Sequence, residues 1–312
     1  MSDTALVSAQ MSRTAVEIAS QPACWRRAAG LAAAPEGAAF LPPPGAELAV
    51  VGCGTSLYVS QAYAGLRERA GKGRTDAFAA SDFPAARAYP YVLALTRSGT
   101  TSEVVNLLRD LAAGGTTTLL VTAVADSPAF ALAGRRLLLD FADEESVVQT
   151  RFATTTLAFL RASLGEDMER VASDAERALA AALPLDPAAT EQVTFLGTGW
   201  TVGLANEAAL KLREAAQAWV ESYPAMEYRH GPISIAAPGR AVWPFGPLPP
   251  GLAEQVRFTG ATLVDTGDLD PLAGLVLAQR YAVATAESRD LDPDKPRSLT
   301  RSVILPSTEM PS

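Results

Sequence analysis

The chain has 312 residues, of which 48% are apolar and 19% are charged, and its formal net charge is −8. This length suggests two domains of roughly 150 residues each, and the composition excludes a disordered or fibrous chain. The acidic balance disfavours nucleic acid and anionic membranes as partners. Because the only histidine is His230 and the only cysteines are Cys24 and Cys53, the sequence predicts no metal site of the structural zinc type.

The amino-terminal region lacks the features of a targeting signal. Residues 1–21 have no basic start and no apolar centre, and they include Asp3 and Glu17. No stretch reaches the roughly 20 apolar residues that span a bilayer, and the cysteines form no disulfide framework. We therefore expect a cytoplasmic protein without a membrane segment.

The first half alternates short apolar runs with helical patterns. Residues 3–34 predict a leading helix that ends at Pro35, and helical patterns recur at 57–70 and 103–113. Short apolar runs typical of buried parallel strands lie at 48–51, 91–95, 117–123 and 135–140. Strands that alternate with helices predict a parallel sheet covered on both faces.

The same order begins again after a helical, alanine-rich stretch at 152–183. A strand run at 193–196 leads into a long helix, and its glycines repeat an earlier pattern: Gly52 and Gly54 in the first copy, Gly197 and Gly199 in the second. This similarity favours an internal repeat of a whole domain over chance.

The second copy is expected to have fewer strands than the first. Further runs predict strands at 241–245 and 261–265 and a helix at 272–288. The predicted units are an amino-terminal helix (1–34), a first domain (35–165), a second domain (190–305) and a tail (306–312).

A glycine-rich turn follows the first predicted strand. In Gly52–Ser56, a phosphate can bind backbone N–H groups around Gly54 at the positive end of the next helix, and Thr55 and Ser56 add hydroxyl donors. A dinucleotide fingerprint is disfavoured because Leu57 stands where its third glycine belongs. A tight turn with a hydroxyl cap is the structural alternative.

A second hydroxyl-rich segment, Thr96–Glu103, again joins a predicted strand to a helix. Thr100 and Glu103 fit a capping box, which leaves the other donors unexplained. Open α/β sheets bind ligands at the carboxyl ends of their strands, so we expect the two loops to share one site. Neither loop has the lysine of a nucleoside-triphosphate motif, and together they favour a sugar phosphate.

Two further segments have residue types suited to proton transfer. Glu207, Lys211 and Glu214 share one face of a helix predicted at 206–220, although spacing alone favours a solvated row of ion pairs. His230 lies in a turn before Gly-Pro, where a structural role and a catalytic role are equally open.

Several motifs together resemble the sugar isomerase (SIS) family, and most closely the isomerase half of glucosamine-6-phosphate synthase. They occur in the family's order over roughly residues 45–305 and are GCGTS (52–56), TRSGTTSE (96–103), LANEAALKLRE (204–214), EYRHGP (227–232) and DKPRSLTRSV (294–303). The resemblance implies an α/β fold of two tandem, doubly wound, flavodoxin-like domains, and a homodimer. No glutaminase-like segment precedes the motifs in this sequence, so glutamine-driven amination is not expected.

The resemblance also implies a role for each matching residue. Glu214 would move a proton between C1 and C2, and His230, supplied by the partner subunit, would open the sugar ring. Residues 144–154, which include Val148, would close over the substrate. The loops and the helix would hold the phosphate and the sugar through Gly54, Thr55, Ser56, Thr96, Ser98, Thr101 and Lys211.

Two positions depart from the family pattern. Arg97 replaces a glutamine and is expected to add a charge-assisted contact to the phosphate. Arg301 replaces the lysine whose amine can form an imine with a ketose, and a guanidinium is not a usable nucleophile at neutral pH. The only lysines of the chain are Lys72, Lys211 and Lys295.

The expected function is an enzyme that opens a hexose or hexosamine 6-phosphate and transfers its C2 proton, as an aldose–ketose isomerase or an isomerising deaminase. A carboxylate can remove this proton once C1 is a carbonyl and donors stabilise the enediolate. Two alternatives stay open: a dehydratase acting on an N-acetylhexosamine 6-phosphate, and a non-catalytic phosphosugar sensor. No cofactor is expected, and the expected partners are a sugar phosphate and a second copy of the chain.

Overall fold

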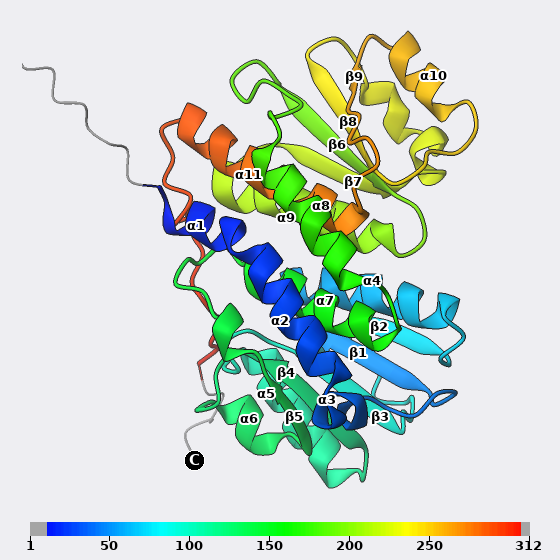
Figure 1. Ribbon diagram of the computed structural model, residues 1–312, viewed down its shortest axis with the longest axis vertical. Coiled ribbons are helices and arrows are strands. Elements are labelled where there is room, and N and C mark those ends of the chain that lie inside the picture. Colours follow the sequence, from blue (N-terminus) through cyan, green and yellow to red (C-terminus); the bar gives the residue numbers. More distant parts are fainter. Residues whose placement is uncertain (1–10, 307–312) are drawn as a thin grey trace, which may run out of the picture.

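The computed structural model describes residues 11–306, which form two parallel β-sheets, one above the other in Figure 1. The first sheet has five strands in the order β2-β1-β3-β4-β5. In chain order they are β1 (Leu48–Gly52), β2 (Thr75–Ala79), β3 (Tyr91–Leu95), β4 (Thr117–Thr122) and β5 (Arg135–Leu138). All neighbours are parallel, and Leu48 is in register with both Thr75 and Tyr91.

Alternate side chains of β1 enter two different cores. Leu48 and Val50 belong to a core that includes helix α4 (Thr55–Arg69), whereas Ala49 and Val51 belong to one that includes α5 (Ser102–Ala113) and the short α6 (Pro128–Leu132). Successive strand residues point to opposite faces, so a strand covered on both faces needs apolar residues at every position. This requirement explains the continuous apolar run in β1.

The second sheet repeats this plan with four strands in the order β7-β6-β8-β9, which confirms that it has fewer strands. The strands are β6 (Gln192–Gly197), β7 (Val220–Pro224), β8 (Arg240–Phe245) and β9 (Thr262–Leu263). Helices α9 (Thr201–Ala216) and α11 (Pro271–Ser288) pack on one face, and α10 (Leu252–Phe258) packs on the other. In each sheet the first strand of the chain lies between the second and the third: β1 lies between β2 and β3, and β6 lies between β7 and β8, as an internal repeat requires.

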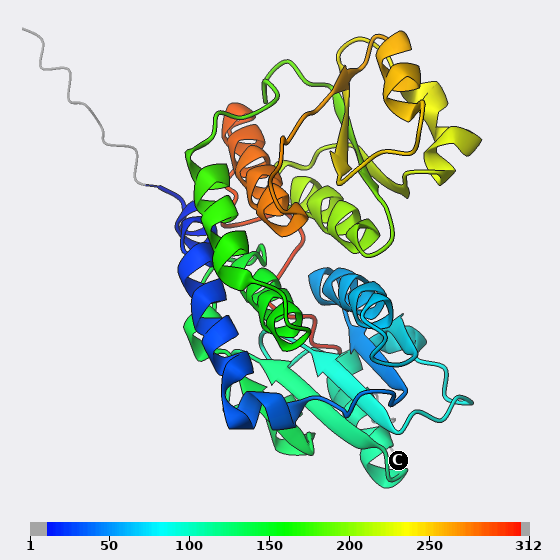
Figure 2. The ribbon, with the colours of Figure 1, turned by 45° about the vertical axis from the view of Figure 1, so that its right-hand side comes forward.

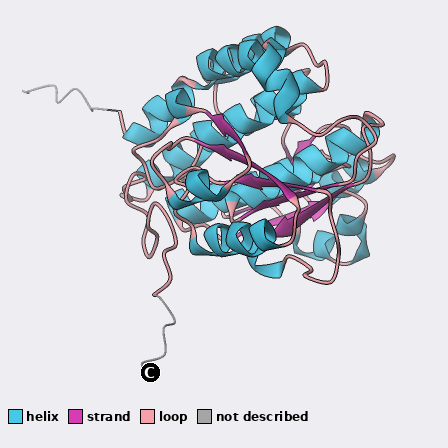
Figure 3. Cartoon of the chain, turned by 90° about the horizontal axis from the view of Figure 1, so that it is seen from below, coloured by secondary structure: helices cyan, strands magenta, loops and turns pink. Residues whose placement is uncertain are grey.

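A layer of helices joins the two sheets (Figure 2). It contains α1 (Arg13–Ala19), α2 (Gln21–Ala33), α7 (Arg151–Ser163) and α8 (Met168–Ala180), while α3 (Pro35–Phe40) leads into the first sheet. One buried cluster runs from Leu48 through Trp25 and Phe159 to Trp243. Seen from below, the strands lie inside and helices surround them (Figure 3). No helix in residues 11–306 is both long enough and apolar enough to cross a bilayer.

The structure corrects several sequence-based boundaries. The leading helix predicted at 3–34 is divided at Ser20 into α1 and α2, and residues 3–10 lie outside the described part. The helix predicted at 152–183 is divided near Gly165 into α7 and α8. The helix predicted at 206–220 ends at Ala216 because Gln217 is left-handed, with φ of 50°. β2 and β7 were not predicted, and the limits of the two domains stay predictions.

Close packing of α4 against α9 joins the two halves beside the strand ends. A Cβ added at Gly203 of α9 would lie 2.4 Å from the carbonyl oxygen of Tyr58 and 2.8 Å from the amide nitrogen of Ala62. The backbones of the two helices therefore approach closely at a residue without a side chain. Because of this approach, Lys211 of α9 reaches Thr55 of α4.

We predict that Gly203→Ala lowers the free energy of unfolding by about 1–3 kcal/mol, because the added methyl group forces α4 and α9 apart. Gly30 in α2 is the matched control, since a Cβ at that position meets no atom within 4 Å. Gly30→Ala should raise the free energy of unfolding by about 0.5–1 kcal/mol, because alanine favours a helix more than glycine. Urea unfolding measures both changes, and a shift of the same sign in the two variants would contradict this interpretation.

Candidate functional site

Both glycine loops line a single pocket at the carboxyl ends of β1 and β3. The pocket has a volume of about 250 Å³. The predicted residues found in its lining are Gly54, Thr55, Ser56, Thr96, Arg97, Ser98, Thr101, Glu214 and Arg301. Val147 and Gln149, from the segment 144–154 that was expected to close over the substrate, also line it. Four further lining residues, Leu299, Thr300, Ser302 and Val303, had no predicted site role.

The first loop places backbone N–H groups and hydroxyls at the amino end of α4. Gly54 has a φ of +54° and precedes Thr55, the first residue of the helix. The first turn of α4 contains no acidic residue. The positive end of a helix macrodipole favours an anion, so this end of the pocket suits a phosphate. The neighbouring Cys53 is a protonated thiol at neutral pH, because burial raises its pKa to about 11.

The second loop is organised by its own hydroxyls. Ser98 Oγ accepts hydrogen bonds from the N–H of Thr100 (3.2 Å) and from Thr100 Oγ1 (2.9 Å). Thr100 Oγ1 also contacts Ser302 Oγ at 2.8 Å. The loop is therefore tied to the carboxyl-terminal segment, which we define as residues 292–306.

The capping box predicted for Thr100 and Glu103 is wrong. The N-cap of α5 is Thr101, which makes no side-chain cap bond. The N–H of Ser102 donates instead to the carbonyl of Val303, at 3.1 Å. A carbonyl of the carboxyl-terminal segment thus takes one of the free donors at the amino end of α5.

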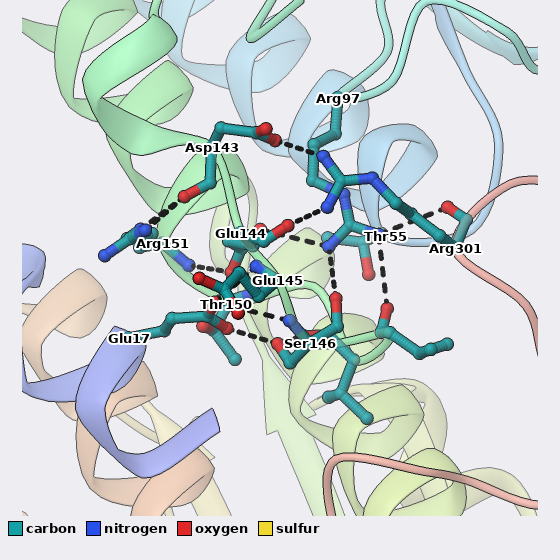
Figure 4. Close-up of polar contacts among 12 residues, drawn as sticks. Glu17, Thr55, Arg97, Asp143, Glu144, Glu145, Ser146, Thr150, Arg151 and Arg301 are labelled. Atoms are coloured by element: carbon teal, nitrogen blue, oxygen red, sulfur yellow. Dashed lines mark hydrogen bonds and ion pairs between the residues drawn. The ribbon is translucent and has the colours of Figure 1, made fainter. Parts of the chain in front are cut away.

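Arg97 joins two walls of the pocket (Figure 4). Its Nη1 donates to the carbonyl of Ser146 (3.0 Å), and its Nη2 donates to the carbonyls of Val147 (3.3 Å) and Arg301 (3.1 Å). Nη1 also lies 3.4 Å from Glu144 Oε2, and both side chains of this ion pair are buried. The charge that was expected to face the phosphate is therefore shared with Glu144, and Nε is left buried without a partner among the described residues.

Glu144 is the centre of this polar cluster. Its Oε1 accepts hydrogen bonds from the N–H of Thr150 (2.6 Å), from Thr150 Oγ1 (2.8 Å) and from the N–H of Arg151 (2.8 Å). The guanidinium of Arg301 bonds to the carbonyl of Glu144 and to the carboxylate of Asp143. Arg301 thus holds one pocket wall to another.

Glu207, Lys211 and Glu214 form a buried charge cluster, so the interpretation as a solvated row of ion pairs is wrong. Lys211 is 1% exposed. Its Nζ lies 2.5 Å from Glu214 Oε2, 2.9 Å from Thr55 Oγ1 and 3.5 Å from Glu207 Oε1. Glu214 is the member of the cluster that lines the pocket.

Burial controls the protonation of this cluster. It raises the pKa of Glu207 to about 8, although the ammonium of Lys211 opposes the shift. Burial also opposes the charge of Lys211, but Glu207 and Glu214 outweigh it and hold the pKa of Lys211 above its usual value. Burial therefore favours the protonated form of Glu207, while Lys211 keeps its contact with Glu214.

Three predicted site residues do not line the pocket of their own chain. Lys211, which was expected to hold the substrate, is buried and bonds instead to Thr55 and Glu214, which do line it. His230 is exposed in the 3-10 turn Glu227–His230, which follows β7. Val148 is buried, while its neighbours Val147 and Gln149 line the pocket. Within residues 11–306, no three His, Cys, Asp or Glu side chains gather as a metal site needs.

The curated relatives of the chain are isomerizing glutamine–fructose-6-phosphate aminotransferases. The enzyme of Sulfolobus acidocaldarius is 26% identical over 295 residues, which cover 83% of this chain and 50% of the relative. That of Methanothermobacter thermautotrophicus is 28% identical over 301 residues, with coverage of 82% and 51%. The chain thus spans about half the length of these relatives. No protein-family model matches it.

Solved structures of phosphosugar enzymes share the fold. The glucosamine-6-phosphate deaminase of Thermotoga maritima superposes with a TM-score of 0.81 at 23% identity, covering 94% of this chain and 100% of that one. The tagatose-6-phosphate ketose/aldose isomerase of Escherichia coli has a TM-score of 0.77 at 18% identity, with coverage of 95% and 97%.

The carboxyl-terminal domain of the glucosamine-fructose-6-phosphate aminotransferase of Francisella tularensis also superposes, with a TM-score of 0.78 at 17% identity and coverage of 92% and 99%. The name of this structure agrees with those of the sequence relatives, of which the matched part covers about half. With the two parallel sheets, these findings confirm the predicted fold and the resemblance to the sugar isomerase family and to the isomerase half of such aminotransferases.

Proposed function

We propose that the pocket binds a hexose or hexosamine 6-phosphate and that the protein transfers its C2 proton, as an aldose–ketose isomerase or an isomerising deaminase. One observation supports this function most. The carboxylate of Glu214 lines the same pocket as two hydroxyl-rich loops at helix amino ends. A sugar phosphate has the matching pair of features, a dianion at one end and a weakly acidic C–H bond at the other.

The phosphate is the natural ligand of the two loops. Thr55, Ser56, Ser98 and Thr101 offer hydroxyls, and the amino end of α4 adds N–H donors and a partial positive charge. Binding energy from this remote group can then be used to hold the sugar carbons against Glu214.

Glu214 is the proposed base for the C2 proton. The hydrogen on C2 becomes acidic only after the ring opens and C1 is a carbonyl, and the proton can then return to C1 to complete the isomerisation. The ammonium of Lys211 donates a hydrogen bond to Glu214 Oε2 at 2.5 Å. It also holds the carboxylate in one orientation.

No lysine stands among the residues that line the pocket. The guanidinium of Arg301 is engaged with Glu144 and Asp143 and has no usable amine. The proposed reaction therefore proceeds through the free carbonyl and an enediolate, without an imine at this position. Loss of the C3 hydroxyl from that same enediolate would make the protein a dehydratase, which is the alternative that the arginine keeps open.

We predict that Glu214→Gln slows the exchange of the C2 hydrogen by about 10²–10⁴-fold, which is the usual contribution of a general base. The measurement is NMR in D₂O of glucose 6-phosphate, glucosamine 6-phosphate, N-acetylglucosamine 6-phosphate and fructose 6-phosphate. Arg213→Gln, an exposed change on the same helix, is the control and should exchange like the wild type.

The product spectrum separates the alternatives. A ketose or released ammonia supports isomerisation or deamination, whereas an alkene carbon identifies the dehydratase. If the wild type binds these ligands but leaves the C2 hydrogen in place, the protein is a sensor and the catalytic proposal is wrong.

We also propose a homodimer in which His230 opens the ring in the pocket of the other subunit. Two observations support this proposal: His230 is exposed, and it does not line the pocket of its own chain. An imidazole can deliver a proton to the ring oxygen and remove one from O1 near neutral pH.

We predict that His230→Ala and Glu214→Gln are each inactive on the cyclic sugar but regain activity when they are refolded together. Each mixed dimer then has one pocket with an intact base and an intact histidine. Turnover of the mixture is compared with that of each variant refolded alone. Activity in a proven monomer, or no recovery in mixtures shown to contain mixed dimers, would contradict the shared site.

The buried Glu207 makes stability depend on pH. Its pKa rises on folding from the ordinary value of 4.5 to about 8, so the folded state binds more protons between these values. This contribution to stability is complete below pH 4.5 and is lost as the pH rises through 8. The loss is at most about 1.4 kcal/mol per pH unit for one proton.

We predict that Glu207→Gln removes this loss, so that the variant gains stability relative to the wild type between pH 5 and pH 8. Urea unfolding at several pH values measures the difference. Glu287→Gln, at an exposed carboxylate of α11, should follow the wild-type profile. Parallel profiles for Glu207→Gln and the wild type would show that Glu207 is ionised in the folded protein.

A further inference from the structure

The helix α1 reaches the pocket wall through one buried carboxylate (Figure 4). Glu17 is 4% exposed. Its Oε1 accepts hydrogen bonds from the N–H groups of Glu145 (2.6 Å) and Ser146 (3.3 Å), and its Oε2 accepts one from Ser146 Oγ. These bonds satisfy backbone donors of a segment that belongs to neither a helix nor a strand.

The same segment is held from its other side by Arg97. The carbonyls of Ser146 and Val147 accept hydrogen bonds from the Arg97 guanidinium, so residues 145–147 lie between Glu17 and Arg97. Val147 and Gln149 then form part of the pocket lining. Loss of the Glu17 contacts would therefore free one side of a pocket wall.

Packing of α1 on the core does not require a buried carboxylate at position 17, and burying this charged group has an energetic cost. Among the described residues, no Lys, Arg or His lies within ion-pair distance of its carboxylate. Burial raises the pKa of Glu17, and the nearby Glu144 adds to the shift, while the bonds from residues 145 and 146 oppose it. An apolar side chain would serve packing alone at lower cost, so the carboxylate requires another explanation.

The amino end of α1 is bonded to another part of the pocket lining, the carboxyl-terminal segment. Asp294 accepts hydrogen bonds from the N–H groups of Arg13 and Thr14 (both 2.8 Å) and from Thr14 Oγ1 (2.7 Å). Asp294 belongs to the carboxyl-terminal segment, whose residues 299–303 line the pocket. One short helix thus connects two walls that are far apart in the sequence.

We propose that Glu17 is a positioning residue of the pocket: its carboxylate holds residues 145–147 against Arg97 and thereby sets the place of Val147 and Gln149 around the bound sugar phosphate. The proposal rests on the proposed function, because it takes the pocket as the sugar-phosphate site. Glu17 itself touches no reacting atom. Its effect is on affinity more than on the chemical step.

The test compares Glu17→Ala with Glu17→Gln, whose amide oxygen still accepts the backbone N–H bonds. We expect Glu17→Ala to weaken binding of glucosamine 6-phosphate about tenfold by calorimetry, with a matching rise in KM and a smaller change in kcat. Amide hydrogen exchange of residues 143–150 should rise about tenfold, while exchange in α2 stays unchanged. Glu17→Gln should restore most of the affinity and protection, and Val16→Thr, at an exposed position of α1, should match the wild type.

Other outcomes overturn the proposal. If Glu17→Ala leaves the affinity for glucosamine 6-phosphate and the amide exchange of residues 143–150 unchanged, the contacts of Glu17 do not hold this wall of the pocket. Faster exchange throughout α1 and α2 would assign Glu17 a general structural role. If Glu17→Ala fails to fold, Ser146→Ala removes the hydroxyl bond to Glu17, together with the bond of the same hydroxyl to the carbonyl of Val148, but leaves the two N–H bonds to Glu17. This variant must still raise the exchange of the Glu145 and Ser146 amides, which bond to Glu17.

Failure of the proposed function has a different result. A wild type that binds glucosamine 6-phosphate but moves no proton refutes the catalytic proposal, while affinity and exchange still decide the role of Glu17. A wild type that binds no sugar phosphate refutes both.

Discussion

The site depends on one buried ammonium group. Lys211 extends from α9 to the first residue of α4, and its charge is shared between Glu214 and the hydroxyl of Thr55. The carboxylate proposed as the base is thus fixed relative to the loop proposed to bind phosphate. An apolar contact between the helices would allow a range of distances, whereas hydrogen bonds to a buried charge specify one. The close approach of the helices at Gly203 is the packing condition for these bonds.

A second buried charge organises the opposite wall. Glu144 takes donors from its own loop and pairs with Arg97, so the guanidinium that follows β3 serves the loop more than it serves a ligand. In the proposed site, the phosphate then relies on hydroxyls and on the N–H groups at the amino end of α4, whose partial charge acts only over a short range. Such a site depends on accurate placement of its walls. Placement is what the contacts of Glu17, Asp294 and Arg301 provide.

The sequence predicted the parts of the fold that are local and left out those that are not. β1, β3, β4, β6 and β8 are buried runs beside glycine or polar turns, and each was predicted within a few residues. β2 and β7 are edge strands with half-buried polar side chains such as Asp76 and Glu221, so they lack the apolar run of a central strand. Spacing placed Glu207, Lys211 and Glu214 on one face, but only tertiary packing makes that face buried. The contact of Glu17 with Ser146 joins distant segments, and no local pattern indicates it.

The arginine at position 301 restricts the chemistry of the proposed reaction. A lysine at this position could form an imine, and the protonated imine would withdraw electrons from C2. Arg301 instead bonds to Glu144 and Asp143 and supports the wall. The acidity of the C2 hydrogen must then come from the free carbonyl and from donors that stabilise the enediolate, a strategy that depends on preorganised groups more than on covalent bonding. The carbonyl oxygen of Arg301 also accepts a hydrogen bond from Arg97. Arg301 therefore supplies no amine for an imine, but both its side chain and its backbone hold the pocket wall in place.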